Sequence, residues 1–190
     1  MSHLTLILLL SIGPSTELVA QGNGRELAVP RAANRPVIDG NLDEAAWQSA
    51  ARLADWVQVE PGDNAAPHGP TIALLAFDAD ALYLGIRALD EPGKIRGRPH
   101  ERDNVVTQSQ DYVSINLDPT NSRRRAFYLA VNPLGVQGDG LTVEGAGWEE
   151  WDGVFRSAGR IGDSAYTIES PFRSGRFATP RETFSVGASP

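Results

Sequence analysis

The sequence of 190 residues lacks cysteine, and it contains one methionine and three histidines. The absence of cysteine excludes disulfides, thiol catalysis and thiolate metal sites. Only His68 and His100 lie beyond the first 20 residues, and both stand beside prolines, so the sequence offers no pattern for a zinc site.

Positive charge is also scarce. The chain has 17 Lys and Arg against 24 Asp and Glu, a formal net charge of -7 and a pI near 4.9. No positive field would gather phosphate backbones, so we expect no nucleic-acid partner. The chain also lacks a G-x-S-x-G motif and a phosphate-binding loop, and its many carboxylates single out no glycosidase pair. We therefore predict that the protein is not an enzyme.

Long apolar runs are absent except for "LTLILLLSI", nine residues from Leu4 to Ile12. A membrane-spanning helix needs about 20 such residues, whereas the h-region of a signal peptide is this short. We predict that residues 1–20 are a signal peptide cleaved after Ala20, and that the protein is exported to the periplasm or the extracellular space. A buried N-terminal strand is the alternative.

Glycine and proline are plentiful, with 19 and 13 residues, and they separate short segments of alternating polarity. Such segments predict strands. They are "DWVQV" (55–59), "TIALLAF" (71–77), "ALYLGIRAL" (81–89), "DYVSINLD" (111–118), "AFYLAVN" (126–132), "VQGDGLTV" (136–143), "VFRSAGRI" (154–161), "AYTIES" (165–170) and "TFSVGA" (183–188). We predict an all-β fold over residues 25–190, a monomeric antiparallel β-sandwich of the jelly-roll or immunoglobulin-like kind.

One short helix is expected near the start of this domain, in "IDGNLDEAAWQSA". Asp39-Gly40 predicts a turn, Asn41 and Glu44 have the spacing of a capping box, and Trp47 would face inward. Further along, Asp78 to Asp80 predict a tight hairpin.

Five ordered motifs resemble the carbohydrate-binding module family 9-like domain: "VIDGNLDEAAW", "DADALYLGIRALDEPGKIRGRPHERD", "DYVSINLDPTNSRRRAFYLAVNPLGVQGDG", "WDGVF" and "ESPFRSGRF". They cover about Pro36 to Val186. The version most similar to this chain opens bacterial outer-membrane-associated proteins that continue into a β-barrel, whereas this chain stops at "FSVGASP". We therefore interpret it as a free-standing sandwich or a truncated product.

The resemblance implies a β-sandwich, export and sugar binding linked to carbohydrate catabolism. In such domains a glycan lies between aromatic faces, calcium is a structural ion nearby, and polysaccharide-degrading enzymes are frequent companions. An envelope or outer-membrane partner protein is implied as well. The alternative function is an envelope structural or interaction domain without sugar binding.

Aromatic side chains are the first candidates for a sugar site, because pyranose C–H faces stack on flat rings. Trp148 and Trp151 stand with three carboxylates in the glycine-flanked stretch "WEEWD", and Trp56 is a third candidate. In an extended segment 148 and 151 would point to opposite faces, so one site needs a bend. Trp151 as a core residue at a strand start, and Trp56 in the core, are the alternatives.

Polar candidates flank two consecutive predicted strands. Arg125, Asn132 and Asp139 could hydrogen-bond a sugar at one end of the sheet. For Asn132 the alternative is a turn, because "NPLG" is a good β-turn sequence. For the "RRR" run that ends at Arg125, the alternative is a solvated strand edge.

Calcium is the one metal that the sequence supports, since it needs clustered oxygen ligands. The stretch from Asp118, "DPTNSRRRAFYL", lacks the glycine and glutamate of an EF-hand loop. Four aspartates could instead gather in space as a calcium site: Asp39, Asp43, Asp111 and Asp118.

Overall fold

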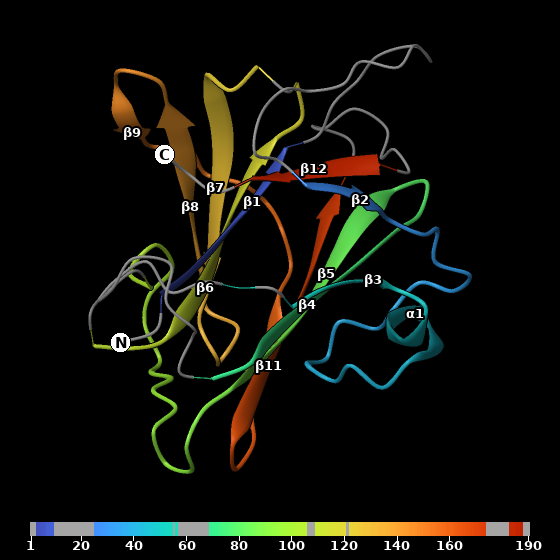
Figure 1. Ribbon diagram of the computed structural model, residues 1–190. Coiled ribbons are helices and arrows are strands. Elements are labelled where there is room, and N and C mark those ends of the chain that lie inside the picture. Colours follow the sequence, from blue (N-terminus) through green and yellow to red (C-terminus); the bar gives the residue numbers. More distant parts are fainter. Residues whose placement is uncertain are drawn as a thin grey trace.

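The computed structural model describes residues 3–9, 25–54, 56, 69–105, 109–120, 122–173 and 183–187. Two β-sheets pack face to face (Figure 1), with strand orders β2-β12-β1-β6-β7-β8-β9 and β10-β11-β5-β4-β3. The first sheet contains β1 (His3–Leu9), β2 (Arg25–Ala28), β6 (Tyr112–Asp118), β7 (Arg125–Val131), β8 (Gln137–Val143), β9 (Gly147–Glu149) and β12 (Thr183–Gly187). The second contains β3 (Ala51–Leu53), β4 (Thr71–Phe77), β5 (Ala81–Leu89), β10 (Ala158–Ile161) and β11 (Ala165–Arg173).

The main core lies between the two sheets. Alternate residues of β5 face it, as Leu84 and Ile86 do, and Ile115 and Leu129 of the other sheet meet them. This is the pattern expected when two sheets bury one face each. The predicted β-sandwich is confirmed.

Most predicted strands are confirmed, and β4 and β5 have the predicted bounds. The segment predicted over 154–161 is wrong in part, because β10 begins only at Ala158. The short strands β2, β3 and β9 were not predicted, since three or four residues carry too little alternation. The predicted strand over 55–59 lies outside the described residues except for Trp56.

Strand β1 lies within the segment for which we predicted a signal peptide. It sits between β12 and β6 and runs parallel to β6, from His3 opposite Tyr112 to Leu9 opposite Asp118. Residues 3–9 therefore form a strand in the full chain, and cleavage of a signal peptide stays a prediction. Residues 10–24 lie outside the described part. No helix in the described ranges is long and apolar enough to cross a membrane.

Two predicted turns are confirmed by their hydrogen bonds. Asp78 Oδ1 accepts bonds from the N–H groups of Asp80 (2.7 Å) and Ala81 (2.9 Å), which closes the β4–β5 hairpin. Gly135 N–H bonds the Asn132 carbonyl at 2.9 Å, and Gly135 has a φ of 82°. Glycine suits this left-handed conformation because it lacks a Cβ.

The predicted short helix is α1 (Ala45–Gln48), on the outer face of the five-stranded sheet beside β4. The capping box is wrong: the N-cap is Glu44, which makes no side-chain cap, and its carboxylate accepts the Val37 N–H instead. Trp47 faces inward as predicted and is 3% exposed. Its ring covers Gly85, where a Cβ would lie 3.1 Å from the indole.

Glu169 of β11 ties the segment before α1 to this outer face. Its carboxylate accepts bonds from the indole N–H of Trp47 (2.8 Å) and from the backbone N–H groups of Asp39 (2.9 Å) and Gly40 (2.7 Å). Burial raises the pKa of Glu169 to about 6, against the lowering effect of these three donors. Glu169 therefore has a structural role, because its carboxylate holds residues 39–40 and the Trp47 indole against the sheet.

The raised pKa of Glu169 predicts a pH dependence of stability. The folded state holds the proton more tightly than the unfolded chain, so this contribution is full below the ordinary pKa of 4.5 and is lost as pH rises through about 6. The free energy of unfolding of the wild type, minus that of Glu169→Gln, should fall by about 1–2 kcal/mol between pH 4 and pH 7. Urea unfolding at each pH measures it, and a flat difference would contradict it.

Candidate functional site

The segment between β9 and β10, residues 150–157, is irregular and is held by side chains rather than by a strand ladder. Arg102 donates to the Gly153 carbonyl, Asp139 accepts from the Gly153 N–H, and Gln137 donates to the Phe155 carbonyl at 3.0 Å. These bonds use backbone groups that a strand would pair with its neighbour. They explain why β10 begins late.

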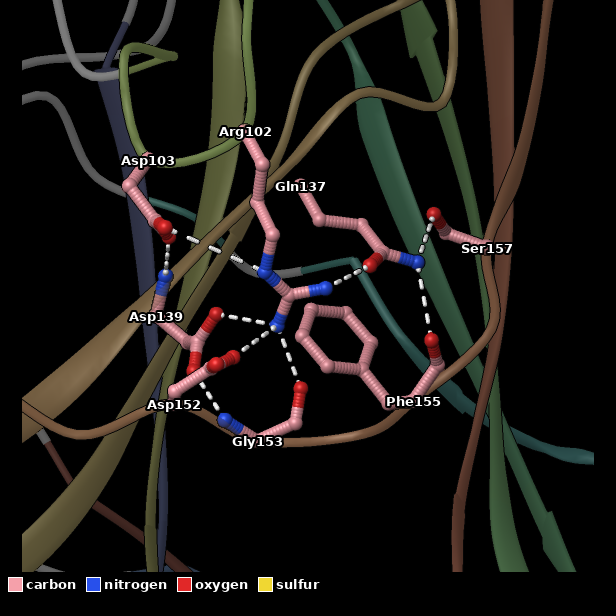
Figure 2. Close-up of polar contacts among 8 residues, drawn as sticks. All are labelled: Arg102, Asp103, Gln137, Asp139, Asp152, Gly153, Phe155 and Ser157. Carbon is pink, nitrogen blue, oxygen red and sulfur yellow. Dashed lines mark hydrogen bonds and ion pairs between the residues drawn. The ribbon is translucent and has the colours of Figure 1, made fainter.

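Arg102 is the centre of this arrangement (Figure 2). It donates to Gln137 Oε1 at 2.7 Å and to Asp139 Oδ1 at 2.5 Å, and its guanidinium lies 5.5 Å from the centre of the Phe155 ring. Its side chain is 36% exposed. The planar group is therefore fixed at the surface, with a ring beneath it.

Asp139 is the buried partner in the arrangement. Its side chain is fully buried, and burial raises the pKa of its carboxyl, while the Gly153 N–H and Arg102 act in the opposite direction. Removing Arg102 would leave this carboxylate without its counter-charge. Asp139 therefore positions Arg102 and Gly153, with no oxygen open to solvent.

Gln137 and Ser157 extend the bonding towards the Asn132 turn. The Gln137 amide donates to Ser157 Oγ at 2.8 Å, and Ser157 Oγ donates to the Gly135 carbonyl at 2.7 Å. Figure 2 shows these bonds continuing from Arg102 through Gln137 to Ser157. The segment is thus held at Gly153, Phe155 and Ser157.

Trp151 and Phe155 bring two aromatic rings to this segment. Trp151 is half-buried and packs on Phe127 of β7, with 4.8 Å between ring centres and an angle of 59°. Gly153 lies against the same indole, where a Cβ would come within 2.2 Å of the ring. Both rings contact the main core on one side.

The other predicted aromatic residues lie in different settings. Trp148 is in the edge strand β9, where its backbone pairs with Thr142, and its side chain lies outside what the structure describes. Trp151 stands beyond the end of that strand, in the irregular segment. Trp56 packs against the main core, and its buried indole N–H has no acceptor among the described residues.

The predicted polar residues are divided between surface and interior. Arg125 is exposed at the start of β7 and pairs with Glu149 at 3.5 Å. Asn132 is fully buried: Oδ1 accepts from Leu134 N–H and Val136 N–H, and Nδ2 donates to the Arg98 carbonyl. The turn alternative therefore describes Asn132, which has no polar atom facing a ligand.

The four aspartates of the predicted calcium site do not gather, which corrects that prediction. Asp39 closes its own turn with Asn41 N–H, Asp111 pairs with Arg96 at 2.9 Å, and Asp118 accepts bonds from its own loop, while Asp43 is exposed before α1. In the described ranges, which include all four, no group of three or more acidic or histidine side chains could hold a metal ion.

Arg102, Phe155 and Ser157 were missed by the sequence reasoning. Arg102 is 35 residues from Gln137 and 51 from Gly153, so no local spacing connects them. The sequence signal is that Arg102, Gln137, Asp139 and Phe155 all lie within the motifs quoted above, in "RD" (102–103), "NPLGVQGD" (132–139) and "WDGVF" (151–155).

Two solved structures have a fold similar to that of this chain. A carbohydrate-binding module family 9 protein from Caldicellulosiruptor kristjanssonii, in complex with glucose, matches 85% of this chain and 78% of its own at a TM-score of 0.56 and 18% identity. The complex with cellotriose gives a TM-score of 0.54 at 18% identity, covering 85% and 76%. The chain has the fold of a family 9 carbohydrate-binding module.

This likeness is one of fold. No protein-family model and no curated protein sequence matches the chain. The family 9 fold agrees with the predicted sandwich, and it is shared at low sequence identity.

Proposed function

We propose that this protein is a non-catalytic carbohydrate-binding module. The observation that carries the proposal is the fold shared with modules that were solved with glucose and cellotriose. The arrangement of Arg102 and Asp139 around the segment 150–157, which carries the rings of Trp151 and Phe155, supports it, because binding sites combine apolar rings with a few fixed polar groups.

The chemistry of the segment suits a sugar. A pyranose can stack its C–H face on an exposed ring while hydroxyl groups donate to carboxylates. Trp148 is proposed as the stacking ring. Asp152, which is 90% exposed and 3.4 Å from Arg102, supplies acceptor oxygens. Arg102 and Asp139 bond Gly153 and so hold the segment 150–157 in place before the ligand arrives, which limits the conformational entropy lost on binding.

Trp148 and Trp151 are proposed to differ in role. Trp148→Ala should abolish sugar binding with little change in melting temperature, whereas Trp151→Ala should mainly destabilise the domain, since its ring packs on Phe127. Calorimetric titration and thermal unfolding of both variants measure this, with Leu134→Ala, an exposed apolar residue, as control. Unchanged sugar affinity in Trp148→Ala would contradict the assignment.

Export is part of the proposal, and it rests on the apolar run near the N-terminus. The mature protein should be recovered outside the cytoplasm without its first ~20 residues, where it would assist polysaccharide-degrading enzymes or contact an outer-membrane protein. Mass spectrometry of the protein from each cell fraction measures this. Recovery of the full-length chain from the cytosol would contradict it.

The alternative function is an envelope structural or interaction domain without sugar binding. An array of plant and bacterial glycans separates the two. The carbohydrate proposal predicts weak, saturable binding to at least one neutral glycan. No binding across the array would favour the structural domain.

A further inference from the structure

The charges around Arg102 do not balance. One guanidinium faces three carboxylates: Asp139 at 2.5 Å, Asp152 at 3.4 Å and Asp103 at 3.9 Å. The Asp139 side chain is fully buried, whereas those of Asp103 and Asp152 are 56% and 90% exposed. Figure 2 shows all three carboxylates on one side of the Phe155 ring. The surface of the cluster is therefore negative.

Arg102 has little donor capacity left for a ligand. NH1 bonds Gln137, and NH2 bonds Asp139 and the Gly153 carbonyl. A bidentate ion pair between arginine and a carboxylate needs two parallel N–H donors of the guanidinium group. Both terminal nitrogens are already engaged inside the protein. The carboxylate of an acidic sugar would therefore be repelled by Asp152 and would form no bidentate ion pair with Arg102.

Two other arginines near this segment are paired, whereas Arg156, in the segment itself, is exposed and has no ion-pair partner among the described residues. Arg125 pairs with Glu149 at 3.5 Å, and Arg124 with Glu144 at 3.3 Å. Glu150 is exposed, beside Trp151, and has no ion-pair partner among the described residues. Glu150 and Asp152 therefore flank the Trp151 position with negative charge, and among the described arginines only Arg102, which Asp139 also engages, pairs with either of them.

We propose that the site selects sugars carrying a protonated amine over neutral sugars and disfavours uronic acids, with Asp152 and Glu150 as the specificity-determining residues. The inference rests on the proposed function, and it names the ligand class for that site. An ammonium group brings a positive charge and N–H donors to acceptors that lack them. A metal ion is a poorer occupant, since no metal-holding group exists within the described ranges.

Three trisaccharides of one β-1,4-linked skeleton test the inference: cellotriose, its 2-amino analogue and its 6-carboxylate analogue. At pH 6 and low salt the amino trimer should bind the full chain about fivefold more tightly than cellotriose, and the carboxylate trimer about fivefold more weakly. Both differences should shrink in 0.5 M NaCl, because salt screens exposed charges.

Substitutions locate the preference. In Asp152→Asn with Glu150→Gln, the affinity for the amino trimer should fall about fivefold more than the affinity for cellotriose. Asp163→Asn removes an exposed charge from the β10–β11 turn and should leave the preference unchanged. Cellotriose binding without an amine preference, or a preference that survives the double substitution, overturns this inference alone. Failure of all three trimers to bind overturns the proposed function with it.

Discussion

Replacing Trp47 with alanine is expected to lower the free energy of unfolding by about 3–5 kcal/mol. The indole packs with Ala81 and Tyr83 on the outer face of the five-stranded sheet, and it covers Gly85, which has no side chain of its own. The substitution also removes the 2.8 Å N–H bond to buried Glu169. A cavity and an under-bonded carboxylate arise together.

Urea unfolding of Trp47→Ala and Trp47→Phe separates the two contributions. Phenylalanine keeps most of the packing and loses the indole donor, so its cost should be smaller, about 1–3 kcal/mol. Gln48→Ala, at an exposed position of the same helix, is the control and should change stability by less than about 0.5 kcal/mol. A Trp47→Ala cost below about 1 kcal/mol would show that the outer face contributes little.

Arg102→Ala is expected to destabilise the protein by about 2–4 kcal/mol and to abolish glycan binding. The buried Asp139 carboxylate loses its counter-charge, and such uncompensated charges are costly. The Gly153 carbonyl and Gln137 lose their donor at the same time, so the segment 150–157 is released. Stability and binding should therefore fall together.

A second substitution identifies the cause. Asp139→Asn in the Arg102→Ala background should recover part of the lost stability, because a neutral amide is easier to bury than a carboxylate. It should not recover binding, since the segment stays detached. Arg124→Ala, at an exposed arginine immediately before β7, is the control. Chemical unfolding and calorimetry give both quantities, and a stable Arg102→Ala variant with normal binding would contradict this role.

The parts of the fold that depend on local pattern could be predicted. Strands β4 and β5 alternate over seven and nine residues, and Asp78 closes the hairpin within a few residues of chain. Trp47 faces inward because its helix must cover the sheet. These features need only neighbouring residues, which a sequence displays directly.

The parts that depend on distant residues could not be predicted. Glu169 bonds Trp47 across 122 residues, and Arg102 holds Gly153 across 51. The capping-box spacing was overridden because Glu44 bonds Val37. Of the four aspartates, Asp39, Asp111 and Asp118 each bond a partner close to them, and Asp43 is exposed. The late start of β10 has the same origin, since side chains from β8 and Arg102 bond the preceding backbone.

Calorimetric titration of the wild-type protein with cellotriose, followed in parallel by tryptophan fluorescence, tests the central claim most directly. Sugar binding at Trp148 and the adjoining segment 150–157 predicts a saturable one-site isotherm of weak affinity, with a fluorescence change that saturates at the same concentration and disappears in Trp148→Ala. No heat and no fluorescence change with cellotriose, together with no binding across the glycan array, would contradict the claim that this sandwich is a carbohydrate-binding module.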